Sequence, residues 1–273
     1  MNRMDGKICV VVGATQGLGA AIARRLAAAG AKAVVVTGRN ADRGAAVAND
    51  ITSRYAVPSC FLQGDLALVE DCRDIIAATD QRFGGIHVLV NAGASTERGT
   101  ILDTSPDLFD SMFATNVRGP FFLMQEAIKL MIRDSITGAI CNIGSISALS
   151  GQPFISAYCA SKGALATLTA NTAFAVMRNR IRVNQLNLGW MDSDNERALQ
   201  ASESGDPGFL SKAAAKLPFG RLVDPEEAAR AVNYLVSDDA GLMTGAIVNY
   251  DQSVWGAVAG GMPTPDAAMS LPE

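Results

Sequence analysis

A continuous apolar run that passes directly into a glycine-rich turn is the feature that most limits how this chain can fold. Residues 8–12 read ICVVV, and residues 13–19 read GATQGLG. Uninterrupted apolar runs are typical of strands that are buried on both faces in a parallel sheet. The alanine-rich segment 20–30 that follows ends at Gly30, as a helix closed by a glycine would. We therefore predict a strand, a tight turn and a helix at the start of a βαβ unit.

The same alternation continues along the chain. One helical segment opens with Ser105 as a predicted N-cap and Pro106 in the first turn, and another opens with Asp224 and Glu227 in a capping-box arrangement. This pattern predicts an α/β protein with a Rossmann-like, doubly wound parallel sheet of about seven strands and helices on both faces. The further strands are expected at 33–37, 60–63, 87–90, 138–143, 182–187 and 245–250.

We expect one domain over residues 1–255, because no repeat or linker divides it. Two regions depart from the alternation of strands and helices. Residues 191–220 are polar and helix-prone and follow the end of a strand, so they are a candidate substrate lid, or else a surface excursion without a catalytic role. The tail 256–273 is rich in Gly, Pro and Ala, and either disorder or packing against a partner subunit would suit it.

Composition limits the classes of function. The chain is 49% apolar and 18% charged, an ordinary globular balance, and its net charge of −4 argues against nucleic acid as the main partner. No apolar stretch reaches the roughly 18 residues of a membrane span, so we expect no membrane partner. The five cysteines include no Cys-x-x-Cys pair, which favours reduced structural thiols and a cytoplasmic location, with a reactive Cys159 as the alternative. His87 is the only histidine, so we expect no metal site.

Gly13, Gly17 and Gly19 lie between the first strand and the first helix. Glycines at such a turn let the backbone approach a pyrophosphate, which then meets the N–H groups and the positive dipole end of the helix. The spacing and the place in the first βαβ unit predict a dinucleotide site. The alternative is a turn that needs only positive φ angles.

The end of the second predicted strand bears on the choice of dinucleotide. An acidic residue here would hold the 2′-hydroxyl of NAD, but Gly38 stands at that place and Arg39 follows it. A guanidinium can bind a 2′-phosphate with a planar set of donors. Arg39 therefore favours NADP(H), with NAD(H) as the second choice; an exposed, solvated arginine is the alternative.

A serine, a tyrosine and a lysine carry the predicted chemistry. Tyr158 and Lys162 are four residues apart, so on a helix they share one face, and Ser145 lies at the end of a predicted strand at the same sheet edge as Gly13. Lys162 would favour the phenolate and so lower the pKa of Tyr158, which could then exchange a proton with a carbonyl oxygen. Ser145 would hydrogen-bond that oxygen as charge develops on it.

In these motifs the chain resembles the short-chain dehydrogenase/reductase family, over residues 5–255. The resemblance implies hydride transfer between a nicotinamide and a carbonyl or secondary alcohol, in a homo-oligomer, either a dimer or a homotetramer. It also implies that Asn116 keeps a water in a proton relay and that Lys162 holds the nicotinamide ribose. The implied catalytic residues are Asn116, Ser145, Tyr158 and Lys162. The implied cofactor-binding residues are Gly13, Thr15, Gln16, Gly17, Leu18, Gly19, Arg39, Asn40, Asp65, Leu66, Asn91, Ala92, Gly93, Tyr158, Lys162 and Gly189.

The substrate is less well defined by the sequence. We expect a small-molecule carbonyl or alcohol, and the polar residues expected around the pocket would suit a sugar, polyol or hydroxy acid. A basic face at Arg178, Arg180 and Arg182 could instead dock a carrier-bound 3-oxoacyl group. Two alternatives stay open: an NAD(H)-dependent sugar or polyol dehydrogenase of the same family, and a dinucleotide-binding regulatory protein without turnover. The pocket is expected from Ser95–Arg98, Ile146–Ser147, Gln152–Phe154, Trp190–Asp192 and part of 193–216.

Overall fold

The computed structural model describes residues 3–255 and 269 and contains one seven-stranded sheet. Every strand pairing is parallel, and the strand order is β3-β2-β1-β4-β5-β6-β7. The predicted fold class and strand number are therefore confirmed. The strands are β1 (Ile8–Val12), β2 (Ala33–Gly38), β3 (Ser59–Gln63), β4 (Val88–Asn91), β5 (Ala139–Ser145), β6 (Arg182–Leu188) and β7 (Ile247–Tyr250).

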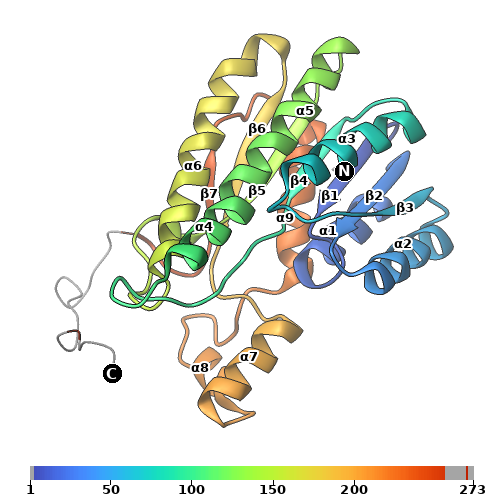
Figure 1. Ribbon diagram of the computed structural model, residues 1–273. Coiled ribbons are helices and arrows are strands. Elements are labelled where there is room, and N and C mark those ends of the chain that lie inside the picture. The colour runs from blue at the N-terminus through green and yellow to red at the C-terminus, as the bar shows by residue number, and fades with distance from the viewer. Residues whose placement is uncertain (1–2, 256–268, 270–273) are drawn as a thin grey trace.

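Helices cover both faces of the sheet (Figure 1). Cys9 and Val11 of β1 point into one core, and Val10 and Val12 point into the other, because successive side chains of a strand alternate between faces. Both faces of β1 are buried, which explains why the strand is an unbroken apolar run. One face packs on α1 (Gly17–Ala28), α2 (Ala41–Tyr55) and α9 (Pro225–Val236), and the other on α3 (Val69–Phe83), α5 (Gly119–Arg133) and α6 (Ser156–Val176).

The helix starts follow the predicted caps, with one difference. Ser105 caps α4 (Pro106–Phe113), where its Oγ accepts a 3.1 Å hydrogen bond from the Leu108 amide. Asp224 caps α9 by accepting from the Glu226 amide at 2.8 Å. The second half of the predicted capping box is wrong, because the Glu227 carboxylate pairs with Arg221 at 2.7 Å. A guanidinium, as a charged donor, competes well with a neutral amide for this carboxylate.

The segment 191–220 leaves the sheet after β6 and holds α7 (Asp194–Ser204) and α8 (Phe209–Ala214). Figure 1 shows these two helices projecting from one end of the molecule, apart from the helices that flank the sheet. The two ends of the segment meet, because the Asp192 amide donates to the Val223 carbonyl and the Val223 amide donates to the Trp190 carbonyl, both at 2.9 Å. The segment is therefore a closed excursion on a narrow base.

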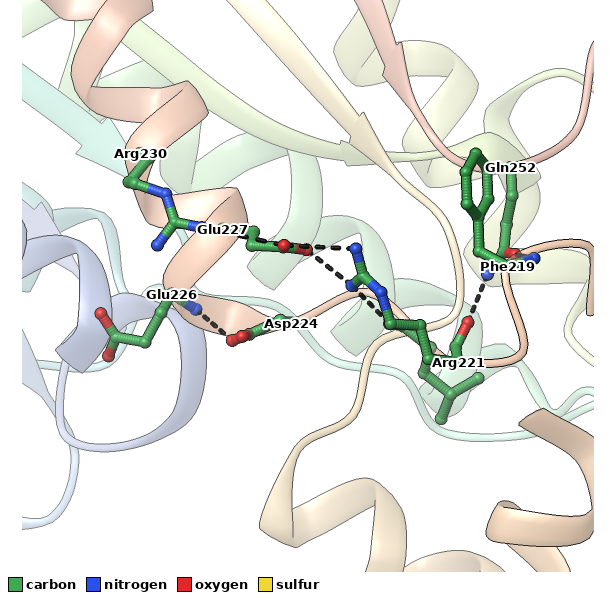
Figure 2. A network of polar contacts seen from close by, with 8 residues as sticks. Phe219, Arg221, Asp224, Glu226, Glu227, Arg230 and Gln252 are labelled. Carbon is green, nitrogen blue, oxygen red and sulfur yellow. Dashed lines mark hydrogen bonds and ion pairs between the residues drawn. The ribbon is translucent and has the colours of Figure 1, made fainter. Parts of the chain in front are cut away.

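Polar contacts fix the C-terminal end of this excursion to the core (Figure 2). Arg221 binds both oxygens of Glu227 on α9, at 2.7 and 3.2 Å. The side chain of Gln252, just after β7, accepts from the Phe219 amide at 2.9 Å and donates to the Arg221 carbonyl. The base of the excursion is thus held by both α9 and the end of β7.

Among the helices of residues 3–255, none combines the length and the apolar character that crossing a bilayer requires. The predicted tail, 256–273, lies outside the described residues except for position 269.

Candidate functional site

The strand order reverses its direction between β1 and β4, and in open α/β sheets ligands bind in the crevice at such a switch point. Gly13 follows β1 and Gly93 follows β4, and the two backbones touch: a Cβ added to Gly13 would collide with Cα of Gly93. A Cβ on Gly93 would in turn stand 2.5 Å from Cδ1 of Leu66. Three predicted residues therefore form one floor, in which the backbone of Gly93 lies between Gly13 and the end of the Leu66 side chain.

The turn from β1 into α1 has the features that a dinucleotide phosphate needs. Gly13 and Gly17 both have positive φ, at +74° and +53°, and the space beside Gly17 is open to 4 Å. Gly19 packs its Cα on the backbone of Gly13, where a Cβ could not fit. Among the described residues no side chain caps the first turn of α1, and that turn holds no acidic residue. Its N–H groups therefore fit an anion.

The end of β2 explains the missing acid. A side chain on Gly38 would meet Cγ2 of Thr15 at 2.6 Å, so Thr15 occupies the space where an acidic side chain would start. Arg39 follows with an exposed side chain, while its carbonyl accepts from Gln63 at 3.0 Å. Asn40 uses its side chain as the N-cap of α2 and accepts from the Arg43 amide at 2.9 Å.

Arg43 was not predicted to belong to this site. Its guanidinium donates to the side chain of Gln16, which lies at the start of α1, so it links the first turn of α2 to the phosphate turn. A second arginine so soon after Arg39 in the sequence is the signal that could have revealed it.

The remaining predicted cofactor residues have structural partners of their own. Asp65 accepts from the Ala67 amide at 2.9 Å and places Leu66 under the crevice. Asn91 is buried; its amide donates to Asn142 Oδ1 at 2.8 Å. Its own Oδ1 is buried without a partner in the described part of the chain. Ala92, Leu18 and Gly189 were also predicted to bind the cofactor. The Ala92 amide donates to the Val12 carbonyl at 3.0 Å, and Leu18 is buried in α1. Gly189 leaves no room for a side chain beside Asp251.

Ser145, Tyr158 and Lys162 converge as predicted. Ser145 ends β5, and Tyr158 and Lys162 lie on the first turns of α6, with Lys162 Nζ 5.6 Å from the centre of the Tyr158 ring. Lys162 is 3% exposed, and its Nζ donates a 2.9 Å hydrogen bond to the Ile143 carbonyl. One helix and one strand end thus place a hydroxyl, a phenol and an amine together at the carboxyl edge of the sheet.

The direction of the Tyr158 pKa differs from the expectation. Burial raises the pKa of Tyr158 above its ordinary value, and the hydrogen bond from Ser145 opposes this without overcoming it. Burial also lowers the pKa of Lys162, to about 8. Burial thus disfavours the charged form of both side chains, which opposes the predicted lowering of the Tyr158 pKa.

Asn116 lies in a π-helical turn, Ala114–Arg118, between α4 and α5. Its side chain accepts from the Ser95 amide at 2.8 Å and donates to the Ser95 carbonyl at 2.9 Å. A third contact, from Nδ2 to Ser161 Oγ at 3.0 Å, ties this pair to α6. The side chain therefore fixes the loop after β4 against the helix of Tyr158, and the water-holding role stays a prediction.

Several predicted pocket residues meet around this centre. The Arg98 guanidinium lies 4.8 Å from the centre of the Phe154 ring and pairs with Glu203 of α7 at 2.5 Å. Ser147 donates to the Gln152 side chain at 3.4 Å. The loop after β4 therefore contacts both the segment before α6 and the 191–220 excursion.

The fold and this site define a nicotinamide-dependent oxidoreductase of the Rossmann-like kind. A family model described as Enoyl-(Acyl carrier protein) reductase matches residues 13–253, most of the chain. The chain belongs to the short-chain dehydrogenase/reductase family, whose dehydrogenases and reductases act on CH–OH groups with NAD(P).

Three relatives illustrate the range of the family. An uncharacterized oxidoreductase of Thermotoga maritima is 33% identical over 90% of this chain and 96% of its own length. Galactitol 2-dehydrogenase of Agrobacterium fabrum is 28% identical over 93% and 99%. The structure of L-sorbose reductase from Gluconobacter frateurii, in complex with NADPH and L-sorbose, superposes with a TM-score of 0.88 at 26% identity, covering 94% of this chain and 100% of that one.

Proposed function

We propose that this chain is an NADP(H)-dependent carbonyl reductase and secondary-alcohol dehydrogenase with Tyr158 as its general acid and base. The observation that carries the proposal is the convergence of Ser145, Tyr158 and Lys162 at the sheet edge that also holds the Gly13–Gly93 crevice. A dinucleotide-binding protein without turnover would have no use for a buried lysine beside a buried phenol, because both cost desolvation energy.

The roles of the chain's own residues follow from this geometry. When bound, the nicotinamide supplies or accepts a hydride. Ser145 donates a hydrogen bond to the substrate carbonyl oxygen, and Tyr158 gives that oxygen a proton during reduction and takes it back during oxidation. Lys162, with a pKa of about 8, is a mixture of ammonium and amine near neutral pH and can return a proton to the phenol.

Two arginines support NADP(H) as the cofactor. Arg39 is exposed just after β2, and Arg43 lies in the first turn of α2, bound to Gln16. Thr15 closes the position where an acid for NAD would stand. A 2′-phosphate would therefore find guanidinium donors close to this strand end.

We further propose roles for the 191–220 excursion and for contacts between copies of the chain. The 191–220 segment would act as a substrate lid hinged on its narrow base, in support of which its helix α7 reaches Arg98 through Glu203. Copies of the chain would pair through α5 and α6, which carry exposed apolar side chains at Phe121, Ile132 and, 76% exposed, Phe174.

The test compares Tyr158→Phe with wild type, and Tyr234→Phe, an exposed tyrosine on α9, serves as the control. NADPH affinity is measured by nicotinamide fluorescence, and turnover is measured on a panel of ketones, sugars and polyols. Tyr158→Phe should bind NADPH as wild type does and lose about 10²- to 10⁴-fold in kcat. A Tyr158→Phe variant with wild-type kcat would overturn the assignment, and a wild type that binds NADPH but turns over nothing would support the regulatory alternative.

A further inference from the structure

Glu196, on the first turn of α7, lies close to the reacting groups although no motif pointed to it. Leu188 at the end of β6 pairs in register with Ser145 at the end of β5, and Trp190 follows two residues later. The Trp190 indole donates a 2.8 Å hydrogen bond to Glu196 Oε1. The glutamate is therefore bound to a residue that stands at the same sheet edge as the catalytic serine.

The local sequence would direct this carboxylate elsewhere. Ser193 is the N-cap of α7 and accepts from the Glu196 amide at 3.2 Å, so Glu196 occupies the position from which a capping-box glutamate reaches back to the N-cap amide. That amide instead donates to the Met191 carbonyl, at 3.2 Å. The Glu196 carboxylate therefore accepts from other donors: the Trp190 indole and, at 2.9 Å, the side-chain amide of Gln200.

Two charge pairs lie near Glu196. Arg98 is paired with Glu203, and Asp192 binds both Nε and Nη2 of Arg197, at 2.6 and 2.7 Å. None of the ion pairs in the described part of the chain includes Glu196, whose two donors, an indole and an amide, are neutral. The Glu196 carboxylate is therefore held by neutral donors only.

Electrostatics agree with that location. Burial is the main reason why the pKa of Tyr158 is raised, and the negative charge of Glu196 adds to the effect. The direction of this effect agrees with a carboxylate on the same side of the sheet edge as the phenol.

We propose that Glu196 is a specificity-determining residue that accepts a hydrogen bond from a hydroxyl of an uncharged, polyhydroxylated substrate, a ketose or an alditol, and repels substrates that carry a carboxylate near the reacting carbon. The inference rests on the proposed function and narrows it. A carboxylate is an acceptor only, so hydroxyl donors satisfy it, whereas a second carboxylate at close range leaves both charges uncompensated. A sugar acid or an acidic acyl carrier would thus be disfavoured relative to a neutral sugar.

The experiment measures kcat/KM for three probes with NADPH: fructose as a ketose, 5-ketogluconate as its anionic counterpart, and cyclohexanone as a ketone without hydroxyls. Glu196→Gln keeps the shape and removes the charge. Asp194→Asn, in the same first turn of α7, is the matched control for the loss of one helix-end charge. Wild type should prefer fructose, and Glu196→Gln should lose about 10- to 100-fold on fructose. It should stay within twofold on cyclohexanone and discriminate less against 5-ketogluconate.

Other outcomes have distinct meanings. An equal loss on fructose and cyclohexanone, or a wild-type preference for 5-ketogluconate, overturns the role of Glu196 while leaving the oxidoreductase in place. If wild type turns over none of the three, the proposed function fails in this form, and calorimetry then decides the inference separately. Sorbitol should bind the NADP⁺ complex of the Tyr158→Phe variant and bind at least 10-fold more weakly when Glu196→Gln is added. Equal sorbitol affinity overturns the inference.

Discussion

The Lys162 ammonium nitrogen donates to the Ile143 carbonyl oxygen at 2.9 Å inside the protein. Ile143 lies near the end of β5, the strand that Ser145 terminates. Burial lowers the pKa of this lysine to about 8. A protonated lysine buried in this position lowers the stability of the fold, and its hydrogen bond to the Ile143 carbonyl offsets part of that cost.

The first prediction follows from that cost. The pKa of Lys162 is lower in the folded protein than in the unfolded one, so the unfolded state binds more protons and stability rises with pH between about 8 and 10.5. Lys162→Met removes the titration. At pH 7 it should gain about 3 kcal/mol in unfolding free energy relative to the charged lysine, before the lost hydrogen bond is subtracted. The advantage should shrink by about 2 kcal/mol at pH 10.

Urea unfolding of both proteins at pH 7 and pH 10 checks this prediction, with Lys129→Met, on the exposed face of α5, as the control. The same stability difference at both pH values would show that Lys162 is not buried with a lowered pKa.

The second prediction concerns the protonation of Tyr158. Because burial raises its pKa above the ordinary value, the phenol of the free protein should stay protonated at least to pH 10. This favours proton donation, and hence reduction, at neutral pH. The difference in ultraviolet absorbance between wild type and Tyr158→Phe should show no phenolate below pH 9. A phenolate signal at pH 7 to 8 would restore the opposite expectation.

The third prediction distinguishes two physical reasons why a position requires glycine: a positive φ angle and a lack of room for a Cβ. Gly13 and Gly84 have nearly the same φ, +74° and +78°, but only Gly13 lacks room for a Cβ. Gly84→Ala should cost about 1 kcal/mol from backbone conformation alone. Gly13→Ala should cost about 2–5 kcal/mol and abolish NADPH binding, because Gly93 must move. Equal unfolding midpoints for the two variants would show that the crevice is not closely packed.

The fourth prediction concerns the cofactor. Arg39→Ala and Arg43→Ala should each weaken NADPH binding about 10- to 100-fold and leave NADH binding unchanged. Arg54→Ala, at the far end of α2, should change neither. Fluorescence titration with both dinucleotides measures this. Equal weakening of NADH and NADPH would place these arginines away from the 2′-phosphate.

The fifth prediction concerns the contact between Arg98 and Glu203. Their side chains are about one third exposed, so solvent screens the pair and its contribution is modest. Glu203→Gln should raise KM for substrate about two- to fivefold and leave the Kd of NADPH unchanged. A change in the Kd of NADPH alone would show that the excursion covers the cofactor rather than the substrate.

Much of the fold could be predicted because the determining signals are local. The continuous apolar run 8–12 requires burial on both faces, and the Ser105 cap and the positive φ angles at Gly13 and Gly17 are local features of the chain. The Tyr158–Lys162 spacing likewise specifies a shared helix face wherever the helix lies.

Tertiary structure alone decided the rest, because burial and charge depend on segments far apart in the sequence. The sequence predicts a lowered pKa for Tyr158, yet the same packing that brings Lys162 to it also removes water from both. The diversion of Glu196 from its own N-cap to Trp190 depends on how the excursion after β6 folds back. Local pattern determined which groups are present, and the long-range packing determined their charge and their partners.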